Sequence, residues 1–446
     1  LFDQAYVEER VVHKGNRITL RWTSAAQPPT PYTAQVQDAR GHIYVEAQPE
    51  AGPDQTVDMG HIGRLFEDDY DVVLLPPLQE YYERNTRYER RIPVTVLDTP
   101  YSTELYGTLG ERRAEALQHA AARGQGLYAE IAKMALGSWS EVASDRILDA
   151  VARVRAREDG SLLDLLGLLG AVRRYGEDPS FPRQVLPQIE ECVLGYRYWH
   201  DEPGNDAMCF SRESRMILAH TCEILAGQMY PDRTFSNAGQ TGEWHREKGQ
   251  RLALAWLHAR GTAGFAEWDA GDAFAEDIVA LSHLLDQSQD TTVQELAAVV
   301  MDKLLLTMAL NSFKGVFGST HGRSDTAALM SGQLEATSGV SRYLWGMGVW
   351  NRHVAGAVSL AVSGYEVPLA IPEIAISRPA EVTNREQHPG VNKVTYRTPD
   401  YMLCSAQDYR PGEGGDEEHI WQATLGPDAV VFVNHPACAS ESDARR

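Results

Sequence analysis

The chain has 446 residues, of which 43% are hydrophobic and 23% are charged, and its formal net charge is −21. This length exceeds one ordinary hydrophobic core, so two or three domains are expected, and the negative charge argues against binding to nucleic acid, which requires clustered Lys and Arg. No apolar stretch is long enough to span a bilayer, so a membrane protein is not expected either.

Residues 1–98 show the alternation of apolar and polar residues that is typical of β-strands. The stretch "RVVHKGNRITLRW" places two alternating runs about a Lys-Gly-Asn turn, and "TAQVQDARGHIYVEAQ" repeats the pattern about Arg40 and Gly41. Two shorter runs follow, "YDVVLLPP" and "RIPVTVLD". We therefore predict a small antiparallel β-sandwich in this part of the chain.

The period becomes helical in residues 99–369, where apolar residues recur three or four positions apart. Examples are "EVASDRILDAVARVRA", "SLLDLLGLLGAVRRYG" and "VQELAAVVMDKLLLTMALNSF". The region is too long for a four-helix bundle, and it lacks the fixed repeat of a solenoid. An α/α toroid or incomplete barrel of paired helices is the predicted arrangement.

Proline and β-branched residues become frequent again in residues 370–446 and just before them. Examples are "YEVPLAIPEIAI", "VNKVTYRTPDYMLCSA", "HIWQATLG" and "AVVFVNHP". We predict strands of a C-terminal β-sheet there, and we expect the sheet to be incomplete in this sequence. The expected fold class is thus multidomain α+β, with a toroid flanked by antiparallel β-sandwich domains.

The cysteines do not form a recognisable metal or redox motif, since CxxC and Cys/His spacings are missing. Their scatter fits free thiols in a reducing compartment, which favours the cytoplasm slightly, while secretion stays open. The loop "HDEPGND" offers His200, Asp201, Glu202 and Asp206 to a cation, but consecutive residues rarely converge on one ion, and a turn is preferred. No metal and no cofactor are predicted, although a divalent cation in this loop stays open. The five cysteines are Cys192, Cys209, Cys222, Cys404 and Cys438.

The stretch "NDAMCFSRESRMILAHTCEILAGQMYPDRTF" becomes an amphipathic helix that opens with four polar residues, Arg212, Glu213, Ser214 and Arg215. These side chains suit a substrate, and the guanidinium of Arg215 can bind a carboxylate through two donors. A solvated helix start with Ser211 as N-cap explains them equally well.

The order of a β-sandwich, a long α/α region and a β-sheet resembles the heparinase II/III-like and alginate-lyase-like polysaccharide lyases. The resemblance implies a cleft across the toroid and β-elimination on a uronate-containing glycan. It also implies an Asn-His pair at the helix mouth, where Ser214 and Arg215 stand, and a tyrosine near Phe274. The departures at the expected catalytic Asn, His and Tyr keep a different chemistry, or none, open.

Other proton-transfer groups could replace the missing ones. His245, in "TGEWHREKGQRLALAW", and His321 are the predicted proton acceptors, and Tyr230 is the predicted donor. An exposed helix end is the alternative for His245. His321 lies in the Gly-rich stretch "NSFKGVFGSTHGRSD", with Asn311 as a further ligand-binding residue and Arg323 as a second carboxylate binder.

An acidic pair flanks an indole at Glu267, Trp268 and Asp269. Trp268 could stack on a sugar ring and Asp269 could bind its hydroxyls, although capping acids around a packed Trp explain the pattern as well. Glu213 with Glu267 or Asp269 would serve a glycoside hydrolase as acid and base.

Two aromatic stretches remain. "RYLWGMGVWNRH" carries Trp345, Trp350, Arg352 and His353 at helical spacing, which favours a core role. Tyr401 and His419, in the predicted C-terminal sheet, could reach the cleft by analogy with the lyases, but packing within the sheet is preferred.

The sequence thus leaves three functions open: a polysaccharide lyase, a glycoside hydrolase, or a glycan-binding protein without catalysis. The expected partner is a polysaccharide or oligosaccharide in each case, and a homo-oligomer stays open. The site hypothesis requires Arg215, His245, Glu267 and His321 to meet in one cleft.

Overall fold

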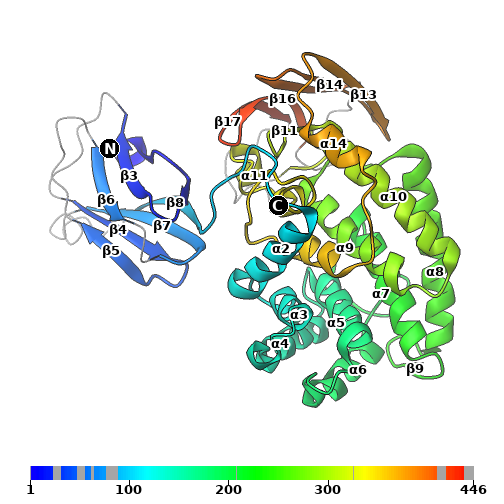
Figure 1. The fold of residues 1–446 in the computed structure, drawn as a ribbon. Coiled ribbons are helices and arrows are strands. Elements are labelled where there is room, and N and C mark those ends of the chain that lie inside the picture. Colours follow the sequence, from blue (N-terminus) through cyan, green and yellow to red (C-terminus); the bar gives the residue numbers. More distant parts are fainter. Residues whose placement is uncertain are drawn as a thin grey trace. The chain divides into compact units, whose positions relative to one another are not determined.

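The structure is a computed structural model that describes residues 2–23, 32–47, 56–61, 65–76, 89–206, 208–324, 326–408 and 418–435. This described part confirms the α+β class, with 13 α-helices and several antiparallel sheets (Figure 1). The chain divides into two compact units, Leu1–Pro100 and Tyr101–Arg446. In the ranges given, no helix has both the length and the apolar character needed to cross a membrane.

The first unit contains two sheets whose buried side chains form one core, including Leu20, Val72 and Val96. The two runs about the Lys-Gly-Asn turn enter different sheets, and β2 pairs in parallel with β8. One sheet has the order β1 (Ala5–Val7), β3 (Arg17–Trp22), β6 (Thr56–His61). The other has the order β2 (Val11–His13), β8 (Arg90–Leu97), β7 (Asp68–Leu75), β4 (Thr33–Asp38), β5 (Ile43–Ala47).

The second unit is built on helices whose apolar faces share one large core, including Leu166, Ile217 and Leu281. Thr108 and Glu111 form a capping box at the first of these helices, which fixes where it begins. The helices are α2 (Leu109–Arg123), α3 (Leu127–Ala135), α4 (Ser144–Ala156), α5 (Ser161–Tyr175), α6 (Leu186–Gly195), α7 (Glu213–Met229), α8 (Gly242–Ala263), α9 (Gly271–Gln287), α10 (Thr291–Leu310), α11 (Thr326–Met330), α12 (Ser338–Trp345), α13 (Ala355–Val362) and α14 (Ala370–Ile376).

Helices α7 and α8 approach each other closely because glycines lie at their contact. A Cβ atom at Gly227 would lie 2.3 Å from the carbonyl oxygen of Gly242, and one at Gly249 would lie 3.0 Å from the carbonyl oxygen of His220. Larger side chains at these positions would push the two backbones apart. Short hairpins follow α7 and α10: β9 (Thr234–Phe235) with β10 (Gln240–Thr241), and β11 (Ser312–Phe313) with β12 (Val316–Phe317).

The C-terminal strands form one antiparallel meander in the same compact unit as the helices. The strand predicted in "YEVPLAIPEIAI" is wrong, because its second half is helix α14. Pro372 lies in the first turn, where its missing N–H costs no hydrogen bond, and Ile371 and Ala375 are buried one turn apart. The strands are β13 (Val382–His388), β14 (Val391–Arg397), β15 (Met402–Gln407), β16 (Glu418–Gly426) and β17 (Ala429–His435).

Four cysteines in the described ranges are free thiols: Cys192, Cys209, Cys222 and Cys404. Burial raises the pKa of Cys192 to about 12 and holds the pKa of Cys222 well above its ordinary value, so these two are unreactive core residues. The fifth, Cys438, lies outside the described residues.

Candidate functional site

The second unit encloses a cavity of about 450 Å³, within the size range of ligand sites. Its wall includes first-turn or N-cap residues of five helices, α3, α5, α7, α9 and α13. A helix N-terminus presents free N–H groups and partial positive charge. The convergence of five such ends favours an anionic ligand.

The charged side chains of the wall add to this field. Five arginines stand against three carboxylates, a formal excess of two positive charges in a chain whose net charge is −21. The arginines are Arg153, Arg212, Arg215, Arg323 and Arg352, and the carboxylates are Asp164, Asp272 and Glu276.

Two of the arginines are held by carboxylates of the wall. Arg153 binds Asp164 through two hydrogen bonds of 2.7 and 3.0 Å, and Arg215 lies 2.9 Å from Glu276. Burial raises the pKa of Glu276, although the attraction of Arg215 opposes that shift. These pairs fix the directions of the guanidinium groups before a ligand arrives.

The start of α7 explains the four polar residues of the helix mouth. Arg212, Ser214 and Arg215 line the cavity, and the Ser214 hydroxyl donates to Glu276 at 2.7 Å. Glu213 instead forms an ion pair with Arg260 and accepts hydrogen bonds from the backbone N–H groups of residues 266 and 267. The N-cap is Arg212, so the N-cap assigned to Ser211 in the alternative explanation is wrong.

A smaller pocket of about 40 Å³ adjoins the cavity and shares part of its wall, including Asp272 and Arg323. Glu335 lines this pocket and accepts hydrogen bonds from the backbone N–H and the hydroxyl of Thr337, at 3.0 and 2.7 Å. Burial raises the pKa of Glu335 to about 7, in spite of these hydrogen bonds. The carboxyl can therefore hold a proton near neutral pH.

His321 also lines the smaller pocket, where its ring Nδ1 contacts the carbonyl oxygen of Asp269. The ring stacks on His419, with 5.0 Å between the centroids. Burial lowers the pKa of both histidines, so the pair is uncharged at neutral pH. His419 is fully buried, contacts the ring of Phe432 in the same sheet and lines neither space, so its contacts fit packing within the sheet, and Tyr401 is 36% exposed.

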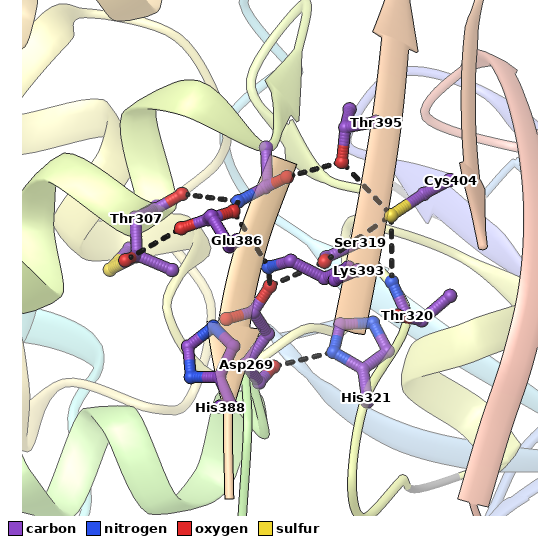
Figure 2. Close-up of polar contacts among 12 residues, drawn as sticks. Asp269, Thr307, Ser319, Thr320, His321, Glu386, His388, Lys393, Thr395 and Cys404 are labelled. Carbon is purple, nitrogen blue, oxygen red and sulfur yellow. Dashed lines mark hydrogen bonds and ion pairs between the residues drawn. The ribbon is translucent and has the colours of Figure 1, made fainter. Parts of the chain in front are cut away.

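A buried ionic network joins the C-terminal sheet to the helical part (Figure 2). Lys393 on β14 contacts Asp269 and lies 3.1 Å from Glu386, its cross-strand partner on β13. Asn311 donates to Glu386 at 2.6 Å, and Ser319 donates to Asp269. Burial opposes the charge on Lys393, but the two carboxylates raise its pKa. The charged groups of the network are thus engaged with one another, and neither Lys393 nor Glu386 lines the cavity.

The structure therefore brings together only part of the predicted site. Arg215 and Arg323 line the cavity and His321 lines the adjoining pocket. Asp269 and Asn311 are fully buried in the network and unavailable to a substrate. Trp268 is only 5% exposed and packs with Val391 and Ala406, so the sugar platform predicted there is wrong.

The remaining predicted residues do not join the cavity wall. His245 is fully buried between α7 and α8, 2.9 Å from Glu223. Tyr230 caps the C-terminal end of α7, roughly 22 Å along the axis from Arg215 at 1.5 Å per residue. Neither Glu213 nor Glu267 lines the cavity, so the predicted hydrolase pair does not face this space.

Several cavity residues escaped the sequence analysis. Asp272 and Glu276 lie one turn apart on α9, a spacing that could have revealed their common face. Trp345 and Trp350 are buried as expected, but Arg352 and His353 from the same stretch line the cavity. Arg153, 59 residues before Arg212 in the sequence, carries no local signal of a site.

Comparison of the chain with protein-family models, with curated proteins and with solved structures finds no match.

Proposed function

We propose that the arginine-lined cavity binds an acidic glycan and that the protein acts as a polysaccharide-lyase-like enzyme on uronate-containing chains. The observation that carries the proposal is the excess of arginine around a ligand-sized cavity whose wall includes N-terminal residues of five helices. Uronate carboxylates are planar anions that match the paired donors of guanidinium groups.

The proposed reaction is β-elimination. Arginine neutralises the uronate carboxylate, which stabilises the enolate-like charge formed when C5 loses its proton. His353 is the imidazole of the cavity wall and accepts that proton in this proposal. The C4–O bond then breaks, a C4=C5 double bond forms, and the imidazolium of His353 gives the proton to the leaving oxygen.

Glycan binding without turnover is the second candidate, and a specific observation favours it. Tyr128 is the one tyrosine of the described cavity wall, and its hydroxyl donates to the carbonyl oxygen of Leu163 at 3.1 Å. Phe274 is fully buried against Phe265 and Phe317. The tyrosine acid expected from the lyase resemblance therefore has no counterpart in this wall.

The finer architecture is also part of the proposal. We infer an incomplete α/α toroid from α2 to α13, because alternate helices bring their N-termini to the same cavity, and a β-sandwich in the first unit, because its two sheets share one core.

The first experiment incubates the protein with polygalacturonate, alginate, heparan-type chains and neutral dextran. Ultraviolet absorbance reports the new double bond, and a reducing-end assay reports any chain cleavage. We expect absorbance to rise together with reducing ends on a uronate substrate, and His353→Gln to abolish both.

Other outcomes discriminate the alternatives. Reducing ends without absorbance would replace elimination by hydrolysis. Binding of acidic glycans without either signal would leave the second candidate. A protein that binds acidic and neutral glycans equally weakly would refute the proposed role of the cavity.

A further inference from the structure

Three buried side chains outside the cavity, Glu202, Glu223 and His245, bring metal-ligating atoms together. One such atom from each lies within 4.8 Å of the others. Nδ1 of His245 is 2.9 Å from Glu223 Oε1 and 3.8 Å from Glu202 Oε1. The three side chains are at most 3% exposed, so water screens their charges little.

The charges of this cluster do not balance. Lys248 supplies one positive charge, with its Nζ 2.7 Å from Asp201, 3.0 Å from Glu202 and 3.4 Å from Glu223. If the ammonium pairs with Asp201, whose side chain is 51% exposed, the buried carboxylates of Glu202 and Glu223 retain two negative charges. Moreover, Oε2 of Glu223 is buried without a hydrogen-bond partner among the described residues. An uncompensated buried carboxylate is costly, and a divalent cation would remove the whole imbalance.

We propose that Glu202, Glu223 and His245 bind a divalent transition-metal ion, with zinc as the best fit. Carboxylate oxygen and imidazole nitrogen are ordinary zinc ligands at about 2.0–2.1 Å, which places tetrahedral ligand atoms roughly 3.4 Å apart. The separations of 2.9 and 3.8 Å from Nδ1 of His245 bracket that value, and the three ligand atoms all lie within 4.8 Å of one another, so small side-chain movements would bring them onto one ion.

Lys248 is compatible with the ion because its shortest contact is to Asp201, whose side chain is 51% exposed. The ammonium can remain with Asp201 at the surface end of the cluster and leave Glu223 to the metal. The ligands are buried and lie outside the cavity, so we expect a structural ion. It would fasten the loop of Glu202 to α7 and α8, since Glu202 already accepts a hydrogen bond from the backbone N–H of Tyr198.

The test uses tag-free protein that is freed of metal with EDTA, dialysed, and titrated with Zn²⁺ by calorimetry and by thermal unfolding. We expect one ion per chain and a rise in Tm. His245→Ala should lose this binding, whereas His258→Ala, at an exposed position of the same helix, should retain it. Failure of the unmodified protein to bind Zn²⁺, or equal binding by both variants, would overturn the proposal.

A second variant decides the case even if His245→Ala does not fold. Lys248→Met removes the competing ammonium, so it should bind Zn²⁺ at least tenfold more tightly, and Zn²⁺ should restore its stability. A cluster that is only an ion-pair network predicts the opposite, a destabilised variant that Zn²⁺ does not rescue. Neither measurement depends on glycan binding or turnover.

Discussion

Two charged regions of the second unit differ in how their charges are used: the buried network around Lys393 and the arginine-lined cavity. The network of Lys393 is buried and tightly bonded, with carboxylates on both sides of one ammonium. The cavity holds an excess of arginine around about 450 Å³ of space. The first region engages its ammonium and carboxylates with one another, whereas the second leaves positive charge for a partner to neutralise.

This difference shows that the role of a charged residue, structural or ligand-binding, cannot be read from its residue type alone. Asp269 and Arg323 both came from stretches with the composition of a binding site, yet Asp269 is fully buried beside Lys393 and Arg323 lines the cavity. Contacts between opposite charges and the available space separate a stabilising cluster from a binding one.

The largest effect on stability is expected from Lys393→Met, which removes the cation of the buried network. Asp269 and Glu386 would remain buried without their cation, so the free energy of unfolding should fall by about 3–5 kcal/mol. Chemical denaturation measures this loss. Arg155→Met, at an exposed ion pair with Glu191, is the control and should change stability little. Similar losses in both variants would contradict the assignment.

Glu335 lines the smaller pocket beside the cavity, and among the described residues its carboxyl accepts hydrogen bonds from Thr337 and forms no ion pair. Its pKa of about 7 in the folded protein exceeds the ordinary value of 4.5, so the folded state retains the proton. Stability from this group is full below pH 4.5 and is lost as pH rises to about 7, by roughly 3 kcal/mol at most.

The measurement compares urea unfolding of the protein and of Glu335→Gln across this pH range. The variant cannot ionise, so its stability should fall less toward neutral pH. Parallel pH profiles would show that Glu335 titrates normally.

A smaller effect is expected from Arg323→Gln, which removes one positive charge from the wall of the cavity. Loss of one charge-assisted contact should reduce affinity for a uronate oligosaccharide about tenfold, or about 1.4 kcal/mol, with little change in stability. Calorimetric titration at low and high salt measures it, since cavity electrostatics should also weaken with salt. Arg155→Gln serves as the matched surface control, and an equal loss there would contradict a specific cavity contact.

The smallest effect should come from Tyr230→Phe. Tyr230 lies at the far end of α7 from the cavity, so glycan affinity and any turnover should remain unchanged. The same titrations and absorbance assay check this expectation. A loss of activity in this variant would show that Tyr230 takes part in the reaction and that the reaction occurs outside the cavity.

The sequence predicted local structure where the pattern was long and regular. Helices α5 and α10 lie where apolar periodicity placed them, and β14 and β15 follow their alternation. It failed at α14, since a short apolar run with prolines fits a strand or a helix equally well. The helix mouth at Arg212–Arg215 was recognised, but not that Glu213 turns away from its neighbours.

Length, composition and periodicity by themselves determined the α+β class and the candidate arginines, because these depend on residues near one another in the chain. Only the tertiary structure decided which charges meet. Glu202 lies in one cluster with Glu223 and His245, and Arg153 and Arg323 line the same cavity, although these residues are far apart in the sequence. Such encounters follow from helix packing and from the free-energy cost of burying an uncompensated charge, neither of which a local pattern records.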